Sequence, residues 1–212
     1  SIPFLENPKY DLKRPQFGAR YVTGVADASG PEAIPIAERC LIGFGNTAGP
    51  GMMGTLYNSS YQFVQTDDYL MIMVEMVHDT RIIPLFDSKE EASKNHRPST
   101  LNQWLGDSVG WYEESTLVVA TININKLQMS QSPIPISPNG RIIERFTRSS
   151  TDEIVYQFTV EDADLYREAW TAELSFYPLE GRIYEYACHE GNYSMPGILA
   201  GARRAEKEQA TN

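Results

Sequence analysis

The stretch Tyr69-Leu-Met-Ile-Met-Val-Glu-Met-Val-His78 is the longest apolar strand that the sequence predicts. Its alternate residues are mostly apolar on both faces, so a strand here would be buried on both sides. Burial of this kind is typical of a barrel wall that is covered by an arm or by another layer. Asp79-Thr80 predicts a turn, and the apolar residues 81–86 predict the second strand of a hairpin.

Further strand patterns lie on both sides of this hairpin. Turn residues separate them, and Asn139-Gly140 is a strong hairpin signal. Short helices fit residues 88–95 and the turn that ends at Trp104. The strands that we predict are 61–65, 69–78, 81–86, 111–112, 116–124, 141–148, 153–160, 169–177 and 182–188. This order predicts an all-β, single-domain antiparallel meander β-barrel that encloses a small-ligand cavity, with a β-sandwich as the alternative.

The chain divides into an arm, a barrel and a tail. Residues 1–40 contain prolines and glycines that break any helix, so we expect an extended N-terminal arm. Residues 41–205 would form the barrel domain. Its glycine-rich start, residues 41–60, predicts a mobile loop that is either a lid or a loose connection. Residues 206–212 are charged and predict a flexible tail.

The charge of the chain restricts its partners. The 212 residues carry a net charge of −10, which argues against nucleic acid, polyanionic substrates and anionic membrane surfaces. It favours a soluble protein with a small neutral, apolar or cationic ligand. The alternative is that the charge serves solubility alone. No apolar run approaches the roughly 18 residues of a membrane helix, so we expect no membrane insertion. Because the first residue is Ser1 rather than Met, we expect that a preceding segment, such as a signal peptide, is absent from this sequence. No pattern indicates an oligomeric state.

The two cysteines, Cys40 and Cys188, are 148 residues apart. In an oxidising compartment they would form one disulfide that closes most of the chain. Two alternatives stay open, namely a pair of buried free thiols and a reactive Cys188 beside His189. The nucleophile is the weakest of the three interpretations, because neighbouring residues of a strand point to opposite faces.

A second informative stretch is Ile183-Tyr-Glu-Tyr-Ala-Cys-His-Glu-Gly-Asn-Tyr193. It predicts a strand that ends at the turn Gly191-Asn192. Cys188, His189 and Glu190 lie at this junction. Polar groups at a strand end are held rigidly and still reach a ligand, so we expect a functional site here.

Glu75, His78, Asp79 and Arg81 form the first candidate site. A carboxylate in an apolar strand is unfavourable unless it is paired or functional, and burial raises its pKa toward the range of a general acid or base. His78 would transfer a proton and Asp79 would orient it, while Arg81 would hold an oxyanion or a carboxylate. Alternatively, Glu75 only forms a buried ion pair, with one of three arginines: Arg81, Arg141 or Arg145.

Three histidines could instead bind a metal. His78, His96 and His189, with Glu190 or Glu75, would suit zinc or another divalent ion. No local motif such as His-x-His supports this set, so we favour a site without a cofactor, in which one or two histidines act as general acid and base.

Aromatic side chains suit a pocket for an apolar or ring-shaped ligand. Tyr61 and Tyr193 are the candidates for positioning a substrate. Most aromatic residues at strand spacing belong to a core, which is the simpler interpretation. Gly-x-Ser-x-Gly, dinucleotide and Cys-x-x-Cys motifs are absent. The full aromatic set is Tyr57, Tyr61, Trp104, Trp111, Tyr184, Tyr186 and Tyr193.

Several blocks of residues 38–205 resemble a family of mostly uncharacterised bacterial proteins, many of them exported. His96 also occupies a position where that family has a histidine. Residues 111–115 depart from the family, which usually has Trp-Glu-Gly-Asp there, and this changes a turn but no candidate site residue. The blocks are Tyr61-Gln-Phe-Val-Gln-Thr66, Glu75-Met-Val-His-Asp-Thr-Arg-Ile-Ile-Pro-Leu85, Gln103-Trp-Leu-Gly-Asp-Ser108, Thr116-Leu-Val-Val119, Glu144-Arg-Phe-Thr147, Phe158-Thr-Val-Glu-Asp162, Trp170-Thr-Ala-Glu173 and Tyr184-Glu-Tyr-Ala-Cys-His-Glu-Gly-Asn-Tyr193.

The resemblance implies an exported protein, periplasmic or secreted, of lipocalin-like (calycin-like) build. It places Cys40 and Cys188 in family positions and so favours the disulfide. It implies no particular reaction.

Together these observations predict a small-molecule enzyme that uses metal-free acid–base chemistry in a barrel cavity, as a lyase, isomerase or cyclase. The first alternative is a non-catalytic periplasmic carrier of an apolar ligand, and the second is a metal-dependent enzyme. The expected catalytic residues are His78, His189, Glu75, Arg81 and Asp79. The expected substrate-binding residues are Tyr57, Tyr61, His96, Trp104, Tyr186, Glu190 and Tyr193.

Overall fold

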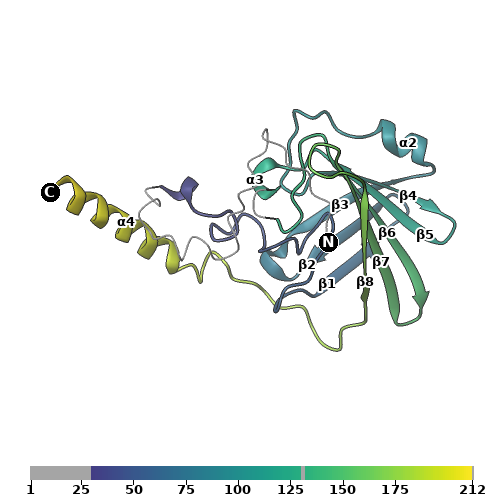
Figure 1. Cartoon of the computed structure of the whole chain (residues 1–212). Helices are drawn as coiled ribbons and strands as arrows, with labels where there is room; N and C mark the ends of the chain where they lie inside the picture. The colour runs from purple at the N-terminus through teal and green to yellow at the C-terminus, as the bar shows by residue number, and fades with distance from the viewer. Residues whose placement is uncertain (1–29, 130–131, 212) are drawn as a thin grey trace.

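A computed structural model describes residues 30–129 and 132–211 of the chain. Eight strands form one curled sheet in the order of the sequence (Figure 1). The all-β, barrel-like fold is therefore confirmed. The strands are β1 (Tyr61–Gln65), β2 (Tyr69–Val74), β3 (Thr80–Phe86), β4 (Asp107–Glu113), β5 (Thr116–Ile122), β6 (Arg141–Ser150), β7 (Glu153–Glu161) and β8 (Trp170–Phe176).

The sheet departs from a closed antiparallel meander at two places. β3 and β4 are parallel, with Leu85 opposite Gly110 and Phe86 opposite Trp111. Parallel neighbours need a long crossover, and residues 87–106 provide it. β1 and β8 are not hydrogen-bonded neighbours, so the sheet formed by the described residues stays open as a half-barrel between these two edges.

Among the described residues, helices are short except at the C-terminus. Helix α2 (Lys89–Lys94) begins where the sequence predicted a helix, because the Ser88 hydroxyl accepts a hydrogen bond from the Glu91 amide. Helix α4 (Ser194–Ala210) projects away from the sheet in Figure 1 and includes residues 206–210, which we had assigned to a flexible tail. The other helical turns are η2 (Pro31–Ala33), η3 (Met76–His78) and α3 (Lys126–Met129).

Three predicted strands differ clearly from the structure. β4 begins at Asp107, four residues before the predicted strand 111–112. The predicted strand 69–78 ends at Val74, and η3 follows it. Residues 182–188 form no strand, so the predicted last hairpin does not exist. Most of the predicted N-terminal arm, residues 1–29, lies outside the described residues.

The interior of the curled sheet is filled by side chains. Tyr156, Phe158 and Val160 alternate along β7 toward the interior and are fully buried. Met52, from the glycine-rich segment 41–60, belongs to the same core cluster. This segment was predicted as a lid or a loose connection, but residues 46–52 are buried and close the interior instead.

Glycine is required where this segment passes the core. Gly49 has a φ of 81°, and a Cβ atom there would lie 2.7 Å from the Nη1 of Arg81. A side chain at this position would therefore be strained in its backbone and would displace a buried cation.

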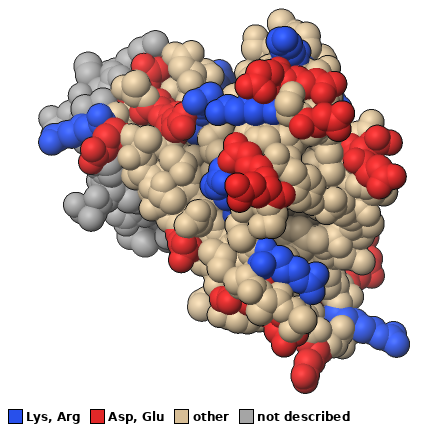
Figure 2. Space-filling view, turned by 90° about the vertical axis from the view of Figure 1, so that its right-hand side faces the viewer, with Lys and Arg blue, Asp and Glu red and all other residues tan. Residues whose placement is uncertain are grey.

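The surface carries charges of both signs. On the face shown in Figure 2, Asp and Glu side chains lie among Lys and Arg side chains, and broad uncharged areas separate them. No single basic field covers this face, in agreement with the net charge of −10.

Candidate functional site

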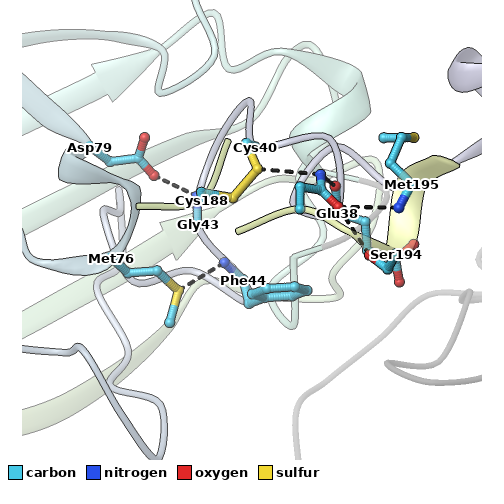
Figure 3. Close-up of a disulfide and its surroundings, with 10 residues drawn as sticks. Glu38, Cys40, Gly43, Phe44, Met76, Asp79, Cys188, Ser194 and Met195 are labelled. Carbon is cyan, nitrogen blue, oxygen red and sulfur yellow. Dashed lines mark hydrogen bonds between the residues drawn. A yellow bond between two sulfur atoms is a disulfide. The ribbon is translucent and has the colours of Figure 1, made fainter. Parts of the chain in front are cut away.

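The predicted disulfide is present. Cys40 and Cys188 are joined with an S–S distance of 2.03 Å and a Cα–Cα distance of 5.7 Å (Figure 3). The bond ties the segment after β8 to the segment before the glycine-rich loop. A disulfide of this kind fits an oxidising compartment.

The chain turns sharply after β2, and this turn forms one side of the site. Val77 and His78 have φ values of 59° and 56°, which L-residues other than Asn and Asp rarely adopt. The turn ends the alternation of β2 before His78. In an uninterrupted strand over residues 69–78, as predicted from the sequence, Glu75 and His78 would have pointed to opposite faces.

Glu75 and His78 instead hold the same segment of chain. The amide of Tyr184 donates to Oε1 of Glu75 at 2.9 Å, and the amide of Tyr186 donates to Nε2 of His78 at 3.0 Å. Alternate amides of an extended segment point the same way, so two side chains replace the backbone partners that a neighbouring strand would offer. Residues 183–188 are therefore fixed without being part of the sheet.

These contacts form a pocket of about 280 Å³ beside the disulfide, which we call the disulfide pocket. His78, Asp79, Tyr186, His189 and Glu190 are among the residues that line it. All five were predicted as catalytic or substrate-binding, and they come from two stretches of the sequence that are more than 100 residues apart. His78 and His189 are both exposed residues, so a ligand can reach them from solvent.

The carboxyl of Asp79, which lines the pocket, has a raised pKa. Its Oδ2 accepts a hydrogen bond from the Gly43 amide at 2.6 Å, and Figure 3 shows the carboxylate pointing to Gly43 beside the disulfide. Burial raises the pKa of Asp79 to about 6, although the Gly43 hydrogen bond and the charge of His78 oppose the shift. Sequence reasoning gave Asp79 only an orienting role, and the hydrogen bond from Gly43 had no signal in the sequence.

Arg81 lies outside this pocket, in the core of the sheet. Its Nη1 donates to Oε1 of Glu144 at 2.9 Å, and its Nη2 bonds to Oε2 of the same carboxylate. Burial would lower the pKa of Arg81, but the adjacent Glu144 carboxylate raises it above its usual value. The guanidinium is therefore committed to Glu144 and does not hold a substrate in the disulfide pocket.

Sequence reasoning missed Glu144. It lies between Ile142 and Phe146 on the face of β6 that is turned toward the core, and it is completely buried. The Tyr156 hydroxyl donates to Glu144 at 2.6 Å, and the Gly51 amide donates at 3.3 Å.

A carboxylate at an inward strand position was the available signal for Glu144. We applied it only to Glu75, for which a buried pair with an arginine was the alternative to a catalytic role. That alternative was wrong, because Arg81 pairs with Glu144 and the Glu75 carboxylate accepts the Tyr184 amide.

The remaining predicted residues lie in different places. The Tyr61 hydroxyl donates to the Thr47 carbonyl at 2.7 Å, and burial raises the pKa of this tyrosine far above its usual value. Tyr57 lies beside Tyr186, whose pKa is raised by burial and by this neighbour. Trp104 is half-buried, and Tyr193 is 85% exposed at the start of α4.

The three histidines do not converge. His96 pairs with Asp107, with 2.7 Å between Nδ1 and Oδ2, whereas His78 and His189 line the disulfide pocket. Within residues 30–129 and 132–211, no three His, Cys, Asp or Glu side chains are grouped so that they could hold a metal ion.

Comparisons with family models, curated proteins and solved structures found no match to this chain. None of the helices in the described part of the chain is both long and apolar enough to cross a membrane.

Proposed function

We propose that the protein is a small-molecule enzyme of the lyase or isomerase type that uses general acid–base chemistry in the disulfide pocket. The observation that carries the proposal is the grouping of Asp79 with His78, His189 and Glu190 around one pocket. A base and a proton donor within one pocket are what a proton abstraction and return require. The disulfide and the resemblance to exported proteins support a periplasmic or secreted location.

Asp79 would be the base. A carboxyl with a pKa of about 6 is ionised at neutral pH and is a stronger base than an ordinary aspartate. The Nε2 atom of His78 already accepts the Tyr186 amide, so His78 would act through Nδ1. His189 or Glu190, which line the same pocket, would return a proton to the substrate. No metal has a role in this scheme.

The experiment is a deuterium-incorporation screen. The full chain is incubated in heavy water with small carbonyl compounds that have acidic C–H bonds, and mass spectrometry follows the uptake of deuterium. We expect uptake in at least one compound, a rate that rises with pH through about 6, and a loss of at least ~100-fold in Asp79→Asn. Asp68→Asn, at an exposed turn carboxylate, is the matched control and should keep the rate.

Equal rates for the wild type and Asp79→Asn would overturn the proposal. Binding without deuterium uptake would favour the carrier alternative. Metal analysis of the purified protein tests the metal-dependent alternative, because one equivalent of zinc that is lost in His189→Ala would make the histidines ligands.

A further inference from the structure

The open side of the half-barrel contains a cavity that is larger than the disulfide pocket. β1 and β8 are not paired, and between them lies a cleft of about 480 Å³, which we call the seam cleft. Its walls are β1 with the two serines before it, the β6–β7 turn, and the end of β8 with residues 177–179. The volume lies within the range of small-molecule sites.

Aromatic rings form the apolar side of the seam cleft. The rings of Tyr61 and Phe63 lie 5.1 Å and 5.8 Å from the ring of Phe176, measured between centroids. These side chains connect the two strand edges where backbone hydrogen bonds do not. Ile154 and Leu179 also line the cleft, so a flat apolar group has surfaces to pack against.

A carboxylate lies in the same cleft. Oε1 of Glu153 accepts hydrogen bonds from the Ser175 hydroxyl at 2.7 Å and from the Tyr177 hydroxyl at 3.1 Å. Oε2 accepts from the Ser149 hydroxyl at 2.8 Å. The bonds from Ser175, Ser149 and Tyr177 lower the pKa of Glu153, so it is ionised at neutral pH. A carboxylate has about four acceptor positions, and three are used here.

Arg148 is the one cation among the described residues that line the cleft, and its guanidinium is bonded within its own turn. It donates to the carbonyls of Ser150 and Thr151. Asp152 adds a second acidic residue to the lining. The described lining thus combines aromatic rings with an excess of negative charge, the combination that recognises organic cations.

We propose that the seam cleft is a second small-molecule site, and that it binds a ring-containing molecule that carries an ammonium group. The ring packs against Phe63 and Phe176, and the ammonium group pairs with Glu153. This site is separate from the disulfide pocket, because the two cavities share no lining residue.

Two matched probes test the proposal, naphthylmethylammonium and its neutral counterpart naphthylmethanol. Calorimetry measures affinity for the full chain at low salt, and amide NMR shifts locate the site. We expect the cation to bind about tenfold more tightly than the alcohol. The amide shifts should be centred on residues 148–154 and 175–179.

Two variants test whether the charge of Glu153, rather than the shape of the cleft, determines the affinity for the cationic probe. Glu153→Gln should weaken the cation about tenfold and leave the alcohol unchanged. Glu161→Gln, at a carboxylate of β7 paired with Arg141 instead, is the matched control and should change neither affinity. Thermal unfolding confirms that each variant is folded.

Equal affinity for the two probes, an affinity that is insensitive to Glu153→Gln, or no binding at millimolar probe would each overturn the proposal. So would amide shifts centred on residues 186–190. Asp79→Asn should leave probe binding unchanged, so that failure of this site and failure of the proposed enzyme activity are told apart.

Discussion

Asp79 and Arg81 are two residues apart, yet they belong to two chemically different regions. Arg81 points into the core, where Glu144, Ser108 and Thr121 surround it, and only 4% of it is exposed. Asp79 lies at the strand end, where one amide and one imidazole face its carboxyl.

The difference lies in how completely the charges are matched. Glu144 accepts hydrogen bonds from Arg81, Tyr156 and Gly51, and burial with Glu144 raises the pKa of Tyr156 well above its usual value. Of the Arg81 nitrogens, only Nε has no partner among the described residues. Such a network maintains the fold. The Asp79 carboxyl is held by fewer bonds and titrates near pH 6, which leaves it available for chemistry.

The largest effect is expected from a variant that breaks the buried ion pair of Arg81 and Glu144. Glu144→Gln should lower the free energy of unfolding by about 3–5 kcal/mol, because it leaves a buried guanidinium without its counter-charge. Urea denaturation measures the loss. Arg145→Ala, which removes an exposed ion pair with Glu113, should cost at most about 1 kcal/mol. If the two losses were equal, the contrast between core and surface charges would be wrong.

Removal of the disulfide should sharpen the comparison. Cys40→Ala with Cys188→Ala should destabilise the protein by about 2–4 kcal/mol, since the bond closes a long loop. Hydrogen exchange should rise for residues 183–189 while β5, β6 and β7 stay protected. Unchanged exchange at residues 183–189 would mean that the contacts of Glu75 and His78 hold the segment alone.

Asp79→Asn should raise the free energy of unfolding at neutral pH, whereas the two changes above should lower it. The folded-state pKa of about 6 lies above the ordinary value of 3.8, so the carboxyl stabilises the fold below pH 3.8, and this contribution is lost as the pH rises through about 6. The variant should therefore be more stable than the wild type at pH 7.5, by up to about 3 kcal/mol, and similar to it at pH 4. Urea denaturation at several pH values measures this. A variant that is less stable at pH 7.5 would show that Asp79 is structural.

The smallest effect concerns His78. His78→Phe removes the acceptor of the Tyr186 amide, so hydrogen exchange at that amide should become about fivefold faster. The Tyr184 amide, which Glu75 holds, is the internal control and should change less. Equal acceleration at both amides would mean that the segment opens as one unit.

Short-range patterns account for what could be predicted. Residues 141–148 and 153–160 alternate between core and solvent, and Asn139-Gly140 marks the turn before them, so β6 and β7 appear where expected. The strand that was predicted at residues 182–188 is absent for a physical reason. Residues 183–188 have a strand pattern, but side chains rather than a neighbouring strand accept their amides. Periodicity does not distinguish these two partners.

The sheet class, the disulfide candidates and several residues of the disulfide pocket could be predicted from the amino-acid sequence, because they depend on local periodicity and on rare residue types. Which charges are paired became evident only from the folded chain. The partner of Arg81 is 63 residues away on β6, and the hydrogen-bond donor to Asp79 is 36 residues away at Gly43. Such pairings depend on strand register and on the course of the glycine-rich segment, which no local pattern encodes.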